Sequence, residues 1–253
     1  MRVLVYSDVH ANRAALEAVL AEPHEMAICL GDLVGYGPEP GACVRLVQDD
    51  ARVVVQGNHD RAVAEGIASL DSKPFSGLDD HTAAIAEARL TPEERAYLAE
   101  LPHWLFATAD GLRCLCVHAT PTDPLYGTVL GGGASAWWGE VAGLPIDAVL
   151  VGNTHQQYTW SIAGVQVVSP GSVGLPADGD PRAAYAVVEN GKVTLKRVAY
   201  PIEDTVRALY AERVPPEAAA ALATWLRTGR APAPVASEVA AGGPPADVAE
   251  GGV

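Results

Sequence analysis

Five short motifs along the chain carry side chains that can bind a divalent metal ion. In chain order they are Asp8-Val9-His10, Gly31-Asp32, Gly57-Asn58-His59-Asp60, His118 and Gly152-Asn153-Thr154-His155. Each motif follows a run of apolar residues and places carboxylate, amide or imidazole groups at its end. Oxygen and nitrogen ligands without cysteine suit manganese, iron or zinc, whereas a structural zinc site usually contains thiolates. The pattern predicts a metal site assembled from distant parts of the chain.

Each motif also has a simpler interpretation when it is taken alone. Asp8 and His10 fit a capped turn that leads into a helix, and Asp32 after a glycine fits an ordinary turn. Asn58 fits a turn residue with a positive φ, and His118 fits a hydrogen-bonded histidine at the end of a strand. We favour the metal site because all five motifs occur in the same context, directly after an apolar run.

Short strands and helices alternate in the first part of the chain. Apolar runs within residues 2–7, 26–32 and 52–60 are each followed by a loop and a stretch of helical composition. This order predicts an α/β fold with parallel strands. The carboxyl ends of such strands line the ligand crevice of an open α/β sheet. We therefore expect the motifs to meet at one edge of the sheet.

The remainder of the chain predicts a second sheet. Residues 79–101 have helical composition, with a capping box at Thr91 and Glu94. From residue 112 onward strand-like segments dominate, and short turns between several of them indicate hairpins in a more antiparallel sheet. Residues 202–227 return to helical composition. The expected fold is two facing mixed β-sheets in a sandwich flanked by helices.

The length and composition favour one domain over residues 1–228. Residues 229–253 are rich in alanine, proline and glycine, and we expect them to be a disordered tail. No apolar run reaches the roughly 18 residues of a membrane span, and Asp8 comes too early for a signal peptide. We expect a cytoplasmic protein without membrane contact. The four cysteines lie among aliphatic residues and are expected in the core.

The charge of the chain limits the classes of partner. Its 17 basic and 31 acidic residues give a formal net charge of −14 at pH 7. Such a charge repels polyanions at long range and argues against a protein that coats nucleic acid. Catalysis on a phosphate is not excluded, because carboxylates that hold cations are counted as negative in this sum.

The order of the motifs resembles the calcineurin-like metallophosphoesterase superfamily, and within it a bacterial phosphodiesterase and phosphoesterase subgroup. The family pattern is DxH, GD, GNH followed by an acid, a lone histidine, and GHxH, of which four elements are intact here. The segments GDLVGYGPEP (31–40) and SPGSVGLPADGDPRAAY (169–185) are similar to loops of that subgroup. The resemblance spans roughly residues 1–200. It implies an α/β sandwich hydrolase that acts on phosphate esters.

The resemblance also implies a role for each candidate residue. By position, the ligands of a first metal ion are Asp8, His10 and His155, the bridging carboxylate is Asp32, and the ligands of a second ion are Asn58, His118 and Asn153. His59 matches the family residue that contacts the phosphate and assists the leaving group, and Asp60 matches its orienting acid. Arg61 and Arg182 are candidates for binding the substrate phosphate, although surface ion pairs would explain them equally well.

Asn153 stands where the family has a histidine. Its amide oxygen can coordinate a metal ion, but it is a weaker neutral ligand than an imidazole nitrogen. We therefore expect two divalent ions with incomplete occupancy of the second site. Manganese is the first choice, and iron, zinc, nickel and cobalt are alternatives. Whether Asn153 is the natural residue or an introduced substitution stays open.

These residues predict hydrolysis of a phosphate ester. Two cations roughly 3.5–4 Å apart activate a bridging water and neutralise charge in the transition state. We expect a phosphodiesterase that acts on nucleotides or nucleic acid by attack of a metal-bound hydroxide. A phosphomonoesterase or protein phosphatase is an alternative, although GDLVGYG lacks the arginine of that subgroup. A metal-binding protein weakened at Asn153 is another. No feature of the sequence indicates the oligomeric state.

Overall fold

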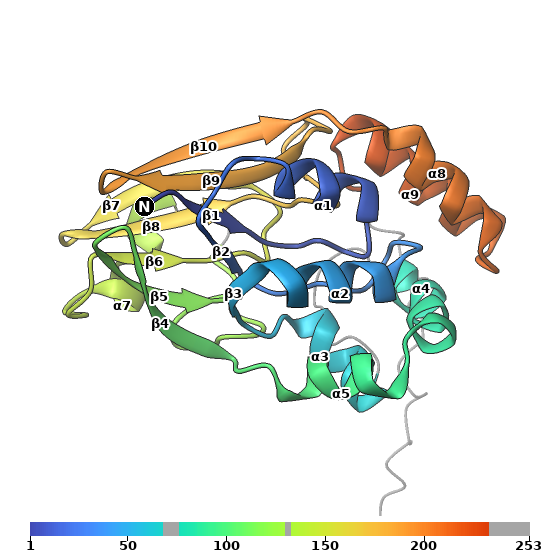
Figure 1. The fold of residues 1–253 in the computed structure, drawn as a ribbon, viewed down its shortest axis with the longest axis horizontal. Helices are drawn as coiled ribbons and strands as arrows, with labels where there is room; N and C mark the ends of the chain where they lie inside the picture. The colour runs from blue at the N-terminus through green and yellow to red at the C-terminus, as the bar shows by residue number, and fades with distance from the viewer. Residues whose placement is uncertain (68–75, 130–132, 233–253) are drawn as a thin grey trace, which may run out of the picture.

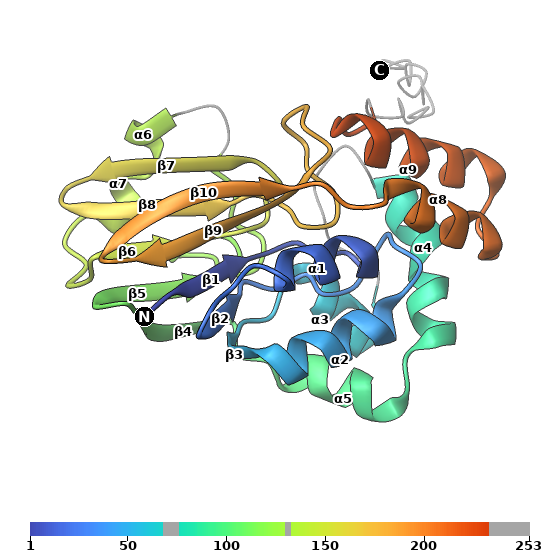
Figure 2. The same ribbon diagram turned by 45° about the horizontal axis from the view of Figure 1, so that its top comes forward.

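Two five-stranded sheets face each other in the computed structural model of the chain (Figure 1; Figure 2). The structure describes residues 1–67, 76–129 and 133–232. Helices lie on the outer sides of the two sheets, so the predicted α/β sandwich with mixed sheets is confirmed. Residues 233–253, which make up most of the tail expected to be disordered, lie outside the described residues.

The secondary structure of the described residues follows the predicted alternation of strands and helices. The strands are β1 (Val3–Tyr6), β2 (Met26–Cys29), β3 (Ala51–Val54), β4 (Trp104–Ala109), β5 (Leu112–Val117), β6 (Ala148–Leu150), β7 (Gln157–Ile162), β8 (Val165–Pro170), β9 (Ala183–Glu189) and β10 (Lys192–Val198). The helices are α1 (Arg13–Leu20), α2 (Pro40–Asp50), α3 (Asn58–Glu65), α4 (Ser76–Arg89), α5 (Pro92–Glu100), α6 (Gly133–Ala136), α7 (Trp138–Val141), α8 (Ile202–Ala211) and α9 (Pro216–Thr228).

The first sheet has the strand order β10-β9-β1-β2-β3. Strands β1, β2 and β3 are parallel, as predicted, and β9 pairs with the other edge of β1 in the antiparallel sense. Residues of β1 alternate between two cores: Leu4 packs in the cluster below α1 and α2, and Val5 packs in the cluster between the sheets. A strand buried on both faces reads as a continuous apolar run, which is why this part of the prediction succeeded.

The second sheet has the order β4-β5-β6-β8-β7. Its three central strands are parallel, and only the edge strands β4 and β7 are antiparallel. Two expectations are therefore corrected. The second sheet is mixed, as expected, but it is no more antiparallel than the first, and β9 and β10 belong to the first sheet. Turn residues indicated that β9 and β10 form a hairpin, but local turn chemistry carries no information on which sheet a hairpin joins.

Local signals elsewhere agree with the structure. The stretch 79–101 contains α4 and α5, and the Glu94 N–H donates to Thr91 Oγ1 at 3.2 Å while the Thr91 N–H donates to the Glu94 carboxylate at 2.9 Å. The four cysteines are free and buried, as predicted. None of the helices in the described part of the chain combines the length and the apolar composition that a membrane span requires.

The last two helices, α8 and α9, pack against each other beyond the end of β10 (Figure 1). Their apolar residues form a cluster that also contains Tyr36 and Leu175, from loops that follow β2 and β8. The C-terminal helices therefore lie against loops at the same end of the sandwich as the predicted motifs.

Candidate metal centre

The seven predicted metal ligands lie together at the carboxyl ends of five strands. They follow β1 (Asp8 and His10), β2 (Asp32), β3 (Asn58), β5 (His118) and β6 (Asn153 and His155). None of them exposes more than 7% of its surface. Buried carboxylates and imidazoles need hydrogen-bonding or charged partners. These seven residues therefore form one polar cluster and not a set of independent turns.

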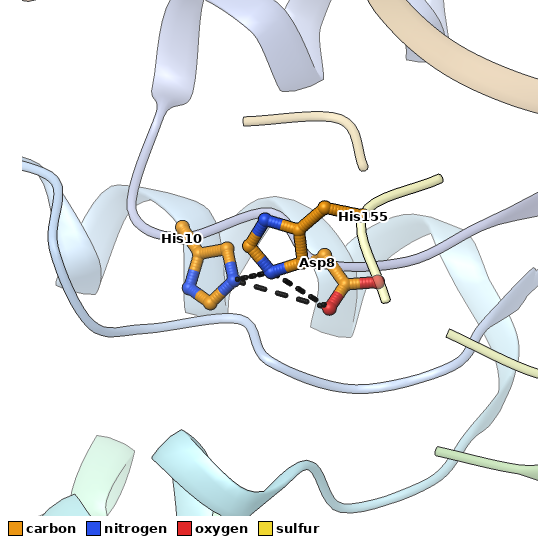
Figure 3. A group of neighbouring side chains, drawn as sticks. All are labelled: Asp8, His10 and His155. Carbon is orange, nitrogen blue, oxygen red and sulfur yellow. Dashed lines mark hydrogen bonds and ion pairs between the residues drawn. The ribbon is translucent and has the colours of Figure 1, made fainter. Parts of the chain in front are cut away.

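The first group of candidate ligands consists of Asp8, His10 and His155, whose ligand atoms lie within 4.8 Å of one another (Figure 3). The His10 and His155 Nε2 atoms are 2.9 Å apart. Asp8 Oδ1 lies 3.4 Å from His155 Nε2 and 3.9 Å from His10 Nε2. Three ligand atoms from two distant segments thus point at one position.

The second group lies beside the first. Asp32 Oδ2 is 3.3 Å from His118 Nε2, and Asn58 Oδ1 is 3.0 Å from the same nitrogen. The same Asp32 oxygen is also 3.7 Å from His10 Nε2, which belongs to the first group. Asp32 therefore lies between the two groups, and its role as a bridging carboxylate stays a prediction.

Backbone carbonyl groups set the orientation of all three histidine rings. The Nδ1 atoms of His10, His118 and His155 lie 3.2, 2.7 and 2.7 Å from the carbonyl oxygens of Val34, Leu30 and Leu175. A carbonyl oxygen only accepts, so each Nδ1 carries the proton. Nε2 is then the nitrogen of each ring that faces the site, which is the arrangement usual for histidine ligands of metal ions.

The two carboxylates are ionised in the buried site. Although burial opposes ionisation, the His155 ring holds the pKa of Asp8 at about 2. Burial also opposes the charge on Asp32, and His118 nevertheless holds its pKa well below the usual range. Against the effect of burial, Asp32 raises the pKa of His118 to about 9, whereas burial lowers the pKa of His10 well below its usual range.

The donor set fits divalent cations. Carboxylate, amide and imidazole groups directed into one buried site form a ligand set that first-row divalent ions accept. Asn58 turns its oxygen towards His118, while its Nδ2 atom is buried without a hydrogen-bond partner among the described residues. Leaving a buried donor unpaired costs about 1–3 kcal/mol, which a ligand bond of the oxygen would offset. The site is thus built around positive charge.

Several of these residues adopt backbone conformations that non-glycine residues rarely use. The φ angles of Asp8, His10, Asp32, Asn153 and His155 lie between 47° and 63°. Each such residue costs about 1–3 kcal/mol unless the surrounding structure compensates. The strain turns the chain sharply after each strand, so that successive side chains point into the same site.

Two glycines permit close approach within the site. A Cβ atom at Gly57 would lie 2.0 Å from Asp32 Oδ1, so the GNH motif needs glycine for the loop to reach the carboxylate. At Gly35, φ is +92° and a Cβ atom would lie 2.8 Å from His59 Nδ1. The glycine-rich loop after Asp32 therefore accommodates the ring of His59.

His59 lies beside both groups. Its ring packs at 5.1 Å from the His10 ring and at 4.8 Å from the Tyr36 ring, measured between centroids. One of its nitrogens lies within 4.8 Å of ligand atoms of His10 and Asp32, and its backbone N–H donates to Asp32 Oδ1 at 2.9 Å. This position suits the predicted role at the substrate, which stays a prediction.

Asp60 supports the loop that carries Asp32. Its carboxylate accepts hydrogen bonds from the backbone N–H groups of Asp32 and Leu33 at 2.8 Å each, from Gly57 at 3.0 Å and from Val34 at 3.2 Å. Burial and the neighbouring Asp32 raise its pKa to about 7. The structure thus gives Asp60 a positioning role towards Asp32, and the predicted effect on His59 stays untested.

Asn153 contacts both the site and a neighbouring loop. Its backbone N–H donates to the two carboxylate oxygens of Asp8 at 3.2 and 3.1 Å. Its side-chain Nδ2 donates to the Gly127 carbonyl oxygen at 3.1 Å. The backbone of Asn153 therefore orients Asp8, and coordination by its amide oxygen stays a prediction.

The two predicted arginines pair with acids. Arg61 Nε lies 2.9 Å from a Glu65 oxygen one turn along α3, and Arg182 Nη2 lies 2.6 Å from Asp180 Oδ2. The Arg182 side chain is 55% exposed. A role in binding the phosphate stays a prediction for both.

Two aromatic residues pack on histidines of the site. Tyr36 is 2% exposed and packs on the rings of His10 and His59, so it is not available to stack on a nucleotide base. Trp225 in α9 stacks on the ring of His155. A lone tryptophan in an amphipathic helix is usual in a protein core, so nothing in the sequence indicated this contact.

Comparison with known proteins identifies relatives of the chain. A family model described as the calcineurin-like phosphoesterase superfamily domain matches residues 1–192. An uncharacterized protein of Methanocaldococcus jannaschii is 30% identical, with 84% of this chain and 93% of that protein covered. The region matched by the family model includes all five motifs.

Solved structures show the same fold. A metallophosphoesterase from Sphaerobacter thermophilus has 33% sequence identity and a TM-score of 0.75, with 90% of this chain and 99% of that chain covered. A hypothetical protein from Pyrococcus horikoshii has a TM-score of 0.77 at 22% identity, with 91% and 99% covered. The coverage extends beyond residue 192, so the similarity to these structures includes part of the C-terminal segment.

Proposed function

Because the chain belongs to the calcineurin-like phosphoesterase superfamily and is therefore a hydrolase of phosphate esters, we propose that it is a phosphodiesterase acting on nucleotides or nucleic acid. The position of Asp32 carries the proposal. One oxygen of this carboxylate lies within 3.7 Å of His10 Nε2 and 3.3 Å of His118 Nε2. A carboxylate between two groups of ligands suits a site for two divalent ions.

The ligands divide between two ions, for which manganese is our first choice. One ion would be held by Asp8, His10, His155 and Asp32, and the other by Asp32, Asn58, His118 and, as a weak ligand, Asn153. Divalent ions supply Lewis-acid stabilisation of charge on the phosphate and lower the pKa of water at neutral pH. The buried carboxylates and oriented imidazoles of this chain fix where that positive charge lies.

His59 would act on the leaving group. Its ring packs against the rings of His10 and Tyr36, and its backbone N–H donates to Asp32 Oδ1, so the residue is placed beside both groups of candidate ligands. A histidine in this place can hold the proton that the departing alkoxide needs. The Asp60 carboxylate accepts four backbone hydrogen bonds and so stabilises the loop that carries Asp32.

The charge around the site favours a diester over a monoester. A monoester dianion requires more positive charge than a diester, which carries one negative charge. Arg61 and Arg182 are engaged by Glu65 and Asp180. The net charge of −14 opposes long polyanions and thus favours small nucleotide substrates. We place the protein in the cytoplasm, in agreement with its four free, buried cysteines.

A second candidate is a metal-binding protein with weakened turnover. The observation that favours it is the side chain of Asn153, whose Nδ2 donates to the Gly127 carbonyl oxygen. An amide engaged in this loop contact, at a position where relatives of the family carry an imidazole, would leave the second ion with fewer strong ligands.

The rates of two chromogenic substrates test the proposal. The purified chain is stripped with a chelator, reloaded with Mn²⁺, Zn²⁺ or Co²⁺, and given bis(p-nitrophenyl) phosphate or p-nitrophenyl phosphate. We expect metal-dependent turnover with preference for the diester, lost in Asp32→Ala and kept in the surface control Asp49→Ala. Preference for the monoester would support a phosphomonoesterase, and metal uptake without turnover of either would support the weakened protein.

A further inference from the structure

Trp225 of the C-terminal helix α9 contacts the candidate metal centre. Trp225 is 1% exposed, and its indole ring stacks on the imidazole of His155 with 5.7 Å between centroids and 28° between planes. The family match ends at residue 192, before α8 and α9 begin. This contact therefore comes from a segment outside the region that the family model matches.

Trp225 also holds the loop on which His155 rests. Its Nε1–H donates to the Pro176 carbonyl oxygen at 2.7 Å. The residues on either side of Pro176 bind His155: the Leu175 carbonyl accepts from His155 Nδ1 at 2.7 Å, and the Ala177 N–H donates to the His155 carbonyl at 3.0 Å. The indole thus fixes the middle of a three-residue segment that bonds to His155 at both ends.

The conformation of His155 makes such support necessary. Its φ angle is +56°, which is costly for a residue with a side chain. Its Nε2 atom is 2.9 Å from His10 Nε2 and 3.4 Å from Asp8 Oδ1, so these contacts require one orientation of the ring. A ligand side chain is kept in one orientation by the residues that pack on it and bond to it. Packing on one face by Trp225 and the hydrogen bond of Nδ1 to Leu175 supply that restraint.

We propose that Trp225 is a positioning residue of the metal centre, which holds the ring and backbone of His155 so that Nε2 faces Asp8 and His10. The inference rests on the proposed function, because it assumes that His155 binds the first ion. Its specific consequence is asymmetry: Trp225 contacts His155, whereas His118 and Asn58 rest on the other strands of the site. Loss of the indole should weaken binding of the first ion and leave the affinity for the second ion unchanged.

Calorimetric titration of the metal-free, full-length chain with Mn²⁺ tests this asymmetry. The variants are Trp225→Leu, which removes both contacts, and Trp225→Phe, which keeps the stacking and loses the Nε1 donor. Trp137→Leu is the matched control, since Trp137 is 2% exposed and packs in the hydrophobic cluster that contains Val141 of α7. Circular dichroism and thermal unfolding report whether each variant folds.

We expect Trp225→Leu to lower the affinity for the first Mn²⁺ ion about tenfold or more. This is the scale of loss seen when a residue that orients a metal ligand is removed. Trp225→Phe should fall between Trp225→Leu and the wild type, and Trp137→Leu should match the wild type. A double-mutant cycle locates the effect. In a His118→Ala background, Trp225→Leu should still weaken Mn²⁺ binding, whereas in a His155→Ala background it should cause no further loss.

Equal Mn²⁺ affinities of folded Trp225→Leu and wild type would overturn the positioning role while the proposed function stands. Equal losses in the two backgrounds would overturn it as well, because they would indicate general destabilisation. If Trp225→Leu does not fold, Trp225→Phe decides, and wild-type affinity in that variant contradicts the proposal. A wild-type chain that takes up no Mn²⁺ would refute the proposed function itself, and with it the role of Trp225.

Discussion

The Nε2 atoms of His10 and His155 lie 2.9 Å apart although 145 residues separate them in the chain. Each ring donates its Nδ1 proton to a backbone carbonyl, of Val34 and Leu175 respectively. Nε2 is therefore the nitrogen of each ring that faces the site. Two imidazole nitrogens this close together, beside the Asp8 carboxylate, form a ligand set that suits a divalent cation.

Replacing Asn153 by histidine should strengthen the second metal site. An imidazole is a better ligand for first-row metals than an amide oxygen. The left-handed backbone at residue 153 tolerates histidine better than most residues, and the backbone hydrogen bonds to Asp8 do not depend on the side chain. We expect about tenfold tighter binding of the second Mn²⁺, measured by elemental analysis at graded metal concentrations.

Asn153→Ala is the control for that substitution. It keeps the backbone N–H on Asp8 and removes both the amide oxygen and the contact with Gly127. If the amide binds the second ion, this variant should lose it. Equal metal content and activity in Asn153→His, Asn153→Ala and the wild type would show that residue 153 has no influence on the metal centre.

His59→Ala should slow turnover without loss of metal. The ring contacts His10 and Tyr36, but ligands enough for both ions remain without it. Loss of a general acid lowers kcat by about 10²- to 10⁴-fold. The loss should be larger for a dinucleotide, whose alkoxide leaving group needs a proton, than for bis(p-nitrophenyl) phosphate, whose phenolate does not. Loss of bound Mn²⁺ in this variant would instead make His59 a ligand.

Asp60→Asn should destabilise the fold as well as the site. The substitution places an NH₂ group opposite backbone N–H donors that now share the Asp60 carboxylate. Unpaired buried donors cost about 1–3 kcal/mol each. We therefore expect the free energy of unfolding of the metal-free chain, measured with urea, to fall by about 2–4 kcal/mol. The exposed control Asp49→Asn should change stability by less than about 0.5 kcal/mol. Equal midpoints for both variants would contradict the positioning role.

Glu22 should contribute to stability in a pH-dependent way. Although partial burial opposes it, bonds from Lys196, Tyr185 and Arg2 hold the pKa of Glu22 at about 2, below its ordinary value of about 4.5. A lowered folded-state pKa gives stability that is complete above the ordinary value and is lost as the pH falls from about 4.5 through about 2.

Unfolding of Glu22→Gln at several pH values measures this contribution. At pH 7 the free energy of unfolding of the wild type should exceed that of the variant by about 1–2 kcal/mol, after allowance for solvent screening. This difference should shrink below pH 4.5. Glu17→Gln, which removes one exposed ion pair with Arg13, should have little effect. A difference that stays constant down to pH 2 would rule out the coupling.

That several candidate metal ligands lie close together could be predicted from the sequence, because their proximity follows from the topology of the parallel strands. Apolar runs identify the strands, and the carboxyl ends of parallel strands lie at one edge of a sheet. Asp8 and Asp32 come directly after such runs in the first sheet, so their proximity needs no knowledge of side-chain packing. His118 follows β5 of the second sheet, and its proximity to them depends on how the two sheets pack. The capping box at Thr91 was predictable as well, since its two residues lie in one turn of helix.

Other features depend on contacts that have no local signal. The hairpin of β9 and β10 joins the first sheet because its residues are buried beside β1, and a turn sequence does not carry that information. Strand β4 was missed because it is an edge strand with exposed aromatic residues, Trp104 and Phe106. The stacking of Trp225 on His155 joins segments 70 residues apart and depends on how α9 packs.

A crystal structure of the chain soaked with Mn²⁺, with anomalous scattering data, tests the central claim most directly. The account predicts two anomalous peaks on either side of the Asp32 carboxylate, the stronger one beside Asp8, His10 and His155. Soaked crystals without a peak at Asp32, or with manganese bound only elsewhere on the surface, would contradict it.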